Sequence, residues 1–121
     1  MATTFTKGFK SPDETRKFKA HGQMDVLKFG DAATIGRGVF EAGWKWSNDV
    51  KPIAGTASCQ SAHTGYCLSG SMTVKMDSGE QFTVRPGDAL HIPPGHDAWT
   101  EGKEPCVLID VTGVKNYAKP K

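Results

Sequence analysis

The sequence of 121 residues contains no long hydrophobic run, and this excludes one class of protein. Its longest apolar stretches are far shorter than the ~20 residues that a membrane-spanning helix needs. The N-terminal segment, residues 1–7, also lacks the apolar stretch of a secretory signal. We therefore expect a protein without a membrane partner and with a cytoplasmic location.

Basic runs and basic stripes are absent as well. Lysine and arginine number 15 against 13 acidic residues, and both kinds of charge are spread along the chain. A nucleic-acid-binding surface gathers its positive charge on one face or in one segment. We therefore expect no nucleic-acid partner.

Cysteine is scarce: the chain has three, and an odd number does not indicate a disulfide framework. In a reducing compartment such thiols are buried small side chains, reactive groups or metal ligands. Cys106 lies within the apolar run 106–109, which favours simple burial. Cys59 instead stands four residues before His63, and thiols and imidazoles are ligands that metals use.

A helical period is missing from about residue 24 onward, where short alternating segments are separated by many of the 14 glycines and 7 prolines. The alternation is cleanest in 72–76 and 81–84, which predicts a hairpin. No internal repeat is present, so the pattern predicts one all-β domain, a sandwich or barrel. The predicted strands are 24–29, 38–47, 66–70, 72–76, 81–84, 89–92 and 106–111, with turns at 77–80 and 85–88 and a loop over 48–56.

The two ends of the chain are polar. Residues 1–21 carry five lysines and arginines and form an N-terminal arm that could pack on the barrel or on a partner subunit, or stay loose. Within the arm, the segment 11–14 reads Ser-Pro-Asp-Glu and fits the start of a short helix. We expect the β-barrel to span 22–114 and a polar tail to follow over 115–121.

Two motifs occur in order in the middle of the chain. Residues 85–96 read Arg-Pro-Gly-Asp-Ala-Leu-His-Ile-Pro-Pro-Gly-His, and residues 66–70 read Tyr-Cys-Leu-Ser-Gly. They resemble the second and the first conserved motif of the cupin superfamily, and the predicted hairpin lies between them as it does in that family. The resemblance implies a cupin jelly-roll barrel with a small-molecule ligand inside, commonly a homodimer.

In the cupin superfamily, the first motif supplies two histidines and a glutamate, the second supplies a further histidine, and the four side chains hold a divalent metal. This chain departs from that pattern. The glutamate position is His63, and the two histidine positions of the first motif are Ala57 and Cys59. The histidine position of the second motif is Ala98, with His96 two residues earlier. The sequence is similar to a bacterial subgroup marked by Pro-Pro-Gly-His-Asp-Ala-Trp, and the resemblance implies Cys59, His63 and His96 as metal ligands.

One thiolate and two imidazoles suit Zn(II) and leave one coordination position for water or substrate. Sulfur favours zinc or copper over magnesium or manganese, and iron remains an alternative because the superfamily often uses it. An open position would let the metal lower the pKa of bound water or polarise a carbonyl. The alternative is a barrel without metal, in which Cys59 is a core thiol and His63 bonds to the backbone.

His96 is the candidate catalytic residue, and three interpretations stay open for it. It is a metal ligand, a general base held by a carboxylate, or a turn residue after Gly95. We expect Asp97 to bond the backbone or to orient a neighbour, and we interpret His91 as structural.

Four aromatic residues are candidates for the walls of a substrate pocket, although core packing alone would explain most of them: Trp44, Trp46, Tyr66 and Trp99. Two functions compete. In the first, the protein is an enzyme whose metal acts on a small polar molecule, as a lyase, isomerase, hydrolase or dioxygenase. In the second, it is a small-molecule sensor or binding barrel without turnover and without an essential metal.

Overall fold

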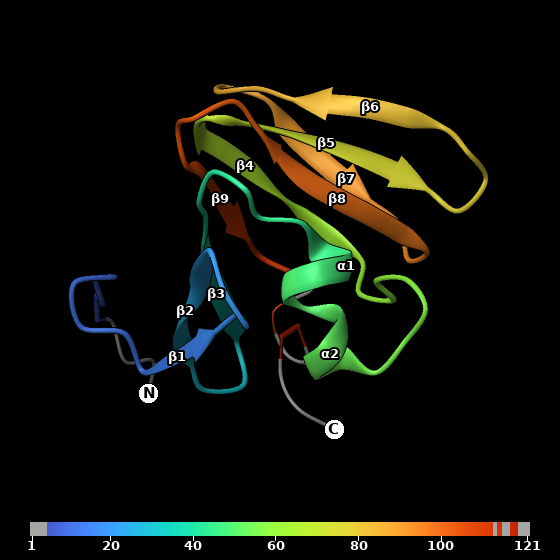
Figure 1. Cartoon of the computed structure of the whole chain (residues 1–121). Helices are drawn as coiled ribbons and strands as arrows, with labels where there is room; N and C mark the ends of the chain where they lie inside the picture. The colour runs from blue at the N-terminus through green and yellow to red at the C-terminus, as the bar shows by residue number, and fades with distance from the viewer. Residues whose placement is uncertain (1–4, 113, 115–116, 119–121) are drawn as a thin grey trace.

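The computed structural model of the protein describes residues 5–112, 114 and 117–118, and almost all of its regular structure is antiparallel β-sheet (Figure 1). One sheet has the strand order β1-β2-β3-β9-β4-β7 and the other the order β6-β5-β8. This confirms the predicted all-β fold. The elements are β1 (Glu14–Lys17), β2 (Gly22–Phe29), β3 (Ala33–Phe40), α1 (Trp46–Asp49), α2 (Lys51–Ala54), β4 (His63–Ser69), β5 (Ser71–Met76), β6 (Gln81–Val84), β7 (Ala89–Ile92), β8 (His96–Glu101) and β9 (Cys106–Asp110).

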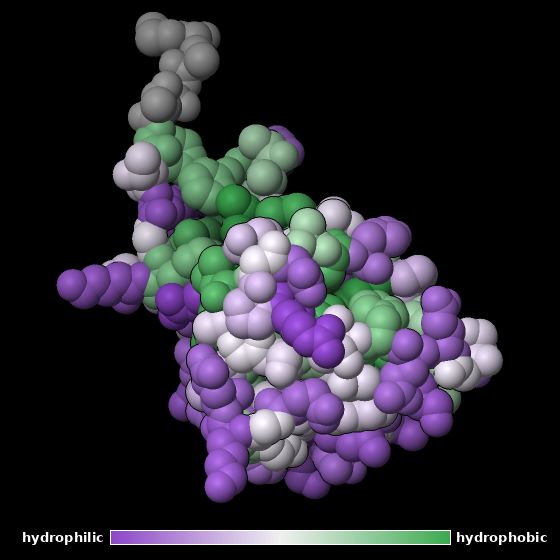
Figure 2. All heavy atoms as spheres, turned by 90° about the horizontal axis from the view of Figure 1, so that it is seen from above, coloured by the Kyte–Doolittle hydropathy of each residue, from purple (hydrophilic) through white to green (hydrophobic). Residues whose placement is uncertain are grey.

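The core lies between the two sheets, and the strand period decides which side chains reach it. In β8 every second residue from His96 to Thr100 is buried, and in β9 every second residue from Cys106 to Asp110 is buried. A strand with this pattern has one face on the core and one toward solvent. The same alternation that buries apolar side chains therefore turns His96 and Asp110 into the interior. On the face seen in Figure 2, polar and charged side chains cover most of the surface.

The predicted hairpin is confirmed. Strands β5 and β6 pair from Met72 opposite Val84 to Lys75 opposite Gln81, and the turn that joins them contains Gly79 with a positive φ of 98°. Glycine adopts this conformation without steric penalty, which fixes the register of the two strands.

The predicted helix after Ser11 is wrong: β1 occupies this region and pairs with β2, with Glu14 opposite Val26. An isolated helix of one or two turns is marginal in water, whereas the edge strand gains backbone hydrogen bonds from a sheet that already exists. Pairing also buries Arg16, whose guanidinium donates to the backbone carbonyls of Val114 and Tyr117.

The predicted strand 38–47 is wrong beyond residue 40 and misses the start of the observed strand, because β3 spans Ala33–Phe40, and the predicted loop 48–56 is partly helical. Strand β3 ends at Phe40, and Gly43, with a φ of 89°, turns the chain so that α1 and α2 follow. Pro52 stands in the first turn of α2, and Gly55 ends that helix with a φ of 74°. Both helices have four residues, and within the described part of the chain no helix has the length and apolar character to cross a membrane.

Most of the predicted tail 115–121 lies outside the described residues. The two described members, Tyr117 and Ala118, are buried. Together with Val114 they pack into the same core as the strands, so this end of the chain contributes to the barrel interior.

Candidate metal centre and interior cavity

The three predicted ligands come from separate segments and meet at one point. Cys59 lies in the loop before β4, His63 begins β4, and His96 begins β8. One ligand atom from each of the three lies within 4.8 Å of the other two. The backbone holds them in place, because the N–H of Cys59 donates to the carbonyl of His96 at 2.8 Å and the N–H of Gly95 donates to the carbonyl of Cys59 at 2.7 Å.

Each imidazole of the cluster has an oxygen acceptor beside Nδ1. In His63, Nδ1 lies 2.5 Å from Oδ2 of Asp110, and Nε2 lies 3.7 Å from Sγ of Cys59. In His96, Nδ1 lies 2.8 Å from the carbonyl oxygen of Pro93. Histidines that bind metals nearly always donate their second ring N–H to a carboxylate or a backbone carbonyl, which fixes the tautomer and leaves the other nitrogen as ligand. Both histidines show this arrangement.

The electrostatics of the cluster favour a thiolate. Burial would raise the pKa of Cys59, but hydrogen bonds and positive charge from His63 and His96 outweigh burial and lower it to about 6. Burial would lower the pKa of His63, but Asp110 and Cys59 outweigh that effect and raise it to about 9. Both shifts therefore favour a thiolate at Cys59 and an imidazolium at His63. The thiolate is the form of cysteine that binds metals, and a metal would displace the proton of His63.

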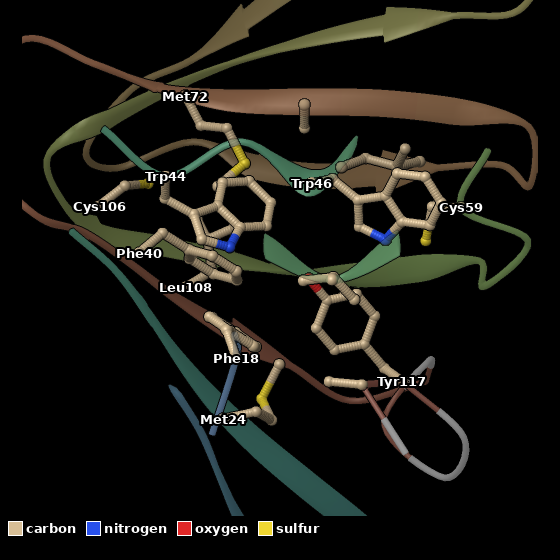
Figure 3. Close-up of a cluster of buried hydrophobic side chains, with 14 of the residues drawn as sticks. Phe18, Met24, Phe40, Trp44, Trp46, Cys59, Met72, Cys106, Leu108 and Tyr117 are labelled. Carbon is tan, nitrogen blue, oxygen red and sulfur yellow. The ribbon is translucent and has the colours of Figure 1, made fainter. Parts of the chain in front are cut away.

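A cavity of about 40 Å³ lies beside His63 and His96, and it has room for a few water molecules. Trp44, Trp46 and Tyr117 form part of its wall, and Figure 3 shows each indole nitrogen on the lower edge of its ring. The rest of the wall is mostly apolar and includes Met24, Phe40, Met72, Leu90, Ile92 and Leu108.

Two of the four predicted pocket residues thus line this cavity, and the other two lie elsewhere. Tyr66 is 46% exposed on the outer face of β4. Trp99 has its neighbours buried on either side in β8, and the Nζ of Lys45 lies 5.6 Å from the centre of its ring. The period of two explains both positions, because Tyr66 and Trp99 occupy the register of their strands that faces away from the core.

The other polar residues around the second motif have local partners. Asp97 accepts a hydrogen bond from the backbone N–H of Ser47 at 3.1 Å, which ties β8 to the start of α1. His91 is exposed and its Nδ1 lies 2.9 Å from Oγ1 of Thr64 on the paired strand. Neither side chain belongs to the cluster formed by Cys59, His63 and His96.

Sequence reasoning missed two residues of the site. Asp110 is the buried last residue of β9. The sequence feature that could have identified it is a charged residue at an inward-facing position of an otherwise apolar strand. Tyr117 lies edge-on to His63 with ring centroids 5.0 Å apart, and its polar neighbourhood in the sequence gave no such signal.

Comparison with known proteins agrees with this geometry. The family model of the cupin domain matches residues 58–112. The chain has no match among the curated proteins. Among solved structures, an RmlC-like cupin from Shewanella frigidimarina NCIMB 400 superposes with a TM-score of 0.60 at 15% identity, covering 95% of this chain and 96% of that one. KdgF from Halomonas sp. has a TM-score of 0.63 at 17% identity, covering 95% and 97%.

A third structure, the polyketide cyclase RemF from Streptomyces resistomycificus, has a TM-score of 0.64 at 19% identity and covers 91% of this chain and 79% of that one. At these low sequence identities, the structural similarity supports a shared fold and does not indicate a shared activity. The matched segment, 58–112, contains both sequence motifs and all three residues of the cluster. Residues 58–112 thus match the cupin domain family, and the chain has the fold of a cupin.

Proposed function

We propose that the protein binds one divalent metal ion through Cys59, His63 and His96, and that it is an enzyme acting on a small molecule held in the interior cavity. Zinc is the metal that this ligand set suits best, with iron and copper as alternatives. The observation that carries the proposal is the pair of Nδ1 contacts, from His63 to Asp110 and from His96 to Pro93. Nδ1 is engaged in both histidines, which leaves Nε2 of each as the nitrogen available to a metal beside the shared thiol.

The number and the type of the candidate ligand residues suit such an ion. Three side-chain ligands leave one position open, which distinguishes a catalytic zinc site from a closed structural one. His63 and His96 both line the cavity, so a molecule inside it would lie on the imidazole side of the cluster. When bound, a metal of this class would polarise a carbonyl or lower the pKa of a bound water.

The protein's own side chains would supply the rest. Asp110 holds the tautomer of His63, and Tyr117 covers the edge of that ring. The apolar wall excludes bulk water, which strengthens every electrostatic interaction inside. With zinc we propose Lewis-acid chemistry of the lyase, isomerase or hydrolase class, and with redox-active iron or copper a reaction of the dioxygenase class. One structural neighbour is named as a polyketide cyclase, and this supports catalysis within the fold.

A second candidate function is a binding or sensor barrel without an essential metal. The contact between Cys59 and His63 favours it, because a thiolate and an imidazolium 3.7 Å apart satisfy each other without an ion. In this case the cavity would bind a small molecule and release it unchanged.

Metal analysis separates the two candidates. Element-resolved emission spectroscopy of the purified protein is expected to give one metal ion per chain, and Cys59→Ser and His63→Ala are expected to lose it. His91→Ala is the matched control, because His91 is exposed and outside the cluster. Full metal content in both cluster variants would refute the ligand assignment, and a folded wild type that takes up no metal would favour the second candidate.

We also propose that the protein is a homodimer, as the family resemblance suggests. Tyr66 and Leu68 on β4 are 46% and 51% exposed, and Val111, just after the neighbouring β9, is 50% exposed. Adjacent exposed apolar side chains of this size are typical of a surface that another protein covers.

A further inference from the structure

The hydroxyl group of Tyr117 is a buried hydrogen-bond donor without a partner in the described part of the chain. The residue is 4% exposed. Its backbone carbonyl accepts from Arg16 and its ring contacts Phe18 and His63, but its hydroxyl makes no hydrogen bond to a described residue. Buried polar groups nearly always have a partner in the protein or in bound water, because the loss of solvent is otherwise not compensated.

This hydroxyl is open to the interior cavity. Tyr117 is one of the lining residues, and in Figure 3 its ring extends from the chain end into the group of core side chains, with the hydroxyl oxygen at its inner end. Among the described side chains, the fully enclosed atoms without a partner are Nε of Arg37 and Nε1 of Trp44 and Trp46. The oxygen of Tyr117 is not one of them, so part of its surface stays free for an atom inside the cavity.

The ring of Tyr117 is held in place, so its hydroxyl has a fixed position. The guanidinium of Arg16 donates to the backbone carbonyl of Tyr117 at 2.9 Å. The ring lies edge-on to Phe18, with centroids 6.1 Å apart, and edge-on to His63, with centroids 5.0 Å apart. A donor that is already ordered loses little conformational freedom when it binds a ligand.

No other side chain of the described cavity wall offers a comparable donor. Nδ1 of His63 and of His96 is engaged, and Nε2 of each is the nitrogen available to a metal. An ionised Asp110 can only accept. The two indole nitrogens are enclosed. Tyr117 carries the only hydroxyl among the described lining residues, and a phenol is protonated at neutral pH.

The surroundings of this donor indicate what kind of molecule it would bind. The polar part of the wall gathers around His63, which contacts Asp110 and the rings of His96 and Tyr117. The rest of the wall is mostly apolar. Such a pocket suits a molecule with one polar end and a hydrocarbon body. A volume of about 40 Å³ limits it to about four non-hydrogen atoms unless the wall adjusts.

We infer that Tyr117 is a specificity-determining residue, whose hydroxyl donates a hydrogen bond to an oxygen atom of the small molecule bound in the cavity. The oxygen is that of a carbonyl or a carboxylate group, and a short hydrocarbon group lies against the apolar wall. The inference rests on the proposed function for the claim that this molecule is a substrate.

The test compares the wild type with Tyr117→Phe, which removes the hydroxyl and keeps the ring. The chain has two tyrosines, and Tyr66→Phe is the matched control, because Tyr66 is exposed and outside the cavity. Acetone and acetate are the probes with an oxygen acceptor. 2-Methylpropene has the same trigonal shape without oxygen. Each is titrated into protein labelled with ¹³C at Cζ of tyrosine, and the two variants assign the two signals.

Acetone or acetate is expected to shift the Cζ signal of Tyr117 in a saturable way and to leave that of Tyr66 in place. A response to acetone alone would identify a neutral ligand and a response to acetate alone an anionic one, and each supports the inference. Backbone ¹H–¹⁵N spectra measure the affinities. Tyr117→Phe should bind the active probe about 2- to 10-fold more weakly, which is the net effect of one hydrogen bond.

The affinity of Tyr117→Phe for 2-methylpropene should not fall, which shows that the cavity is intact, and Tyr66→Phe should bind every probe as the wild type does. The inference is overturned if neither oxygen probe shifts the Tyr117 signal. It is also overturned if Tyr117→Phe binds the active probe as tightly as the wild type, or if it loses affinity for 2-methylpropene to the same extent.

Metal content is measured on the same samples after incubation with zinc, which separates this inference from the proposed function. One metal ion per chain without a response of Tyr117 would overturn the inference and leave the metal centre standing. A response of Tyr117 in a protein that takes up no metal would support the inference and overturn the metal centre.

Discussion

Oδ2 of Asp110 lies 2.5 Å from Nδ1 of His63, so a carboxylate on β9 sets the orientation of an imidazole on β4. The contact depends on a close approach of the two strands, which pair with Gly65 opposite Asp110. Because Nδ1 is engaged, Nε2 is left facing Cys59. The position of the thiol's partner is therefore decided by a residue 47 positions away in the sequence.

Asp110→Asn should weaken metal binding without abolishing it. The amide lacks the charge that raises the basicity of His63, and loss of such an outer carboxylate typically lowers metal affinity about 10- to 100-fold. Competition with a chromophoric chelator measures the affinity. Asp31→Asn, in the exposed turn after β2, is the matched control and should bind as the wild type does. Equal affinity in both variants would contradict the positioning role.

Removal of the metal should lower the free energy of unfolding. An ion that binds only the folded state stabilises it by about 2.7 kcal/mol at a free concentration of 100 times its Kd. Urea unfolding with zinc and with excess chelator measures the difference. In Cys59→Ser the two curves should nearly coincide, and a chelator effect of the same size in that variant would show that the ion binds elsewhere.

Gly65→Ala should destabilise the fold. A Cβ at this position would lie 1.8 Å from the backbone oxygen of Ile109, so β4 and β9 would have to separate. Overpacking of this kind costs about 1–3 kcal/mol, which urea unfolding measures. Gly8→Ala is the control, because no heavy atom lies within 4 Å of the place that its methyl group would occupy. An unchanged midpoint in Gly65→Ala would contradict the tight strand pairing.

The hydrogen bond from Arg16 lowers the pKa of Glu14 from 4.5 to about 2, with Lys28 also contributing. A carboxyl group whose pKa falls on folding stabilises the protein above its unfolded pKa and loses this effect as the pH falls through its folded pKa. Glu14→Gln should therefore be less stable than the wild type above pH 4.5, and the difference should vanish by about pH 2.

The size of this effect should be about 1 kcal/mol or less, because Glu14 is partly exposed and solvent screens the pair. Urea unfolding at several pH values measures it, with Glu80→Gln in an exposed turn as the control. A difference between Glu14→Gln and wild type that stays constant down to pH 2 would rule out titration of Glu14 as its cause.

Leu68→Lys should weaken the proposed dimer. The substitution places a charge among exposed apolar side chains of the outer face of β4, where desolvation would oppose association. Sedimentation at several protein concentrations measures the oligomeric state, with Gln81→Lys on the exposed register of β6 as the control. A dimer of undiminished affinity in Leu68→Lys, or a monomeric wild type, would refute this proposal.

The local pattern was enough to predict the central hairpin and the all-β fold, because alternation and glycine turns act within a few residues. The positions of Cys59, His63 and His96 in the two family motifs also identified them as candidate ligands of one metal. The prediction of a helix after Ser11 was wrong because it also used only local sequence. The segment fits a helix start, and pairing with the neighbouring strand β2 overrides that preference.

Contacts between segments that are distant in the sequence could not be predicted from the sequence alone. Asp110 meets His63 only because β4 and β9 are neighbours in the sheet, and Tyr117 lines the cavity although it lies after the last strand. The placement of Tyr66 and Trp99 on the opposite face of their strands shows how one residue of register decides whether an aromatic side chain is wall or surface.

Arg16 fastens the two ends of the chain to each other, because its guanidinium binds the carbonyls of Val114 and Tyr117. Neither end belongs to the segment matched by the family model, residues 58–112. We therefore expect relatives with the same two motifs but different termini to share the ligand cluster and to differ in the part of the cavity wall that Tyr117 forms here. Ligand choice would then diverge through the chain ends, while the chemistry of the central strands stayed the same.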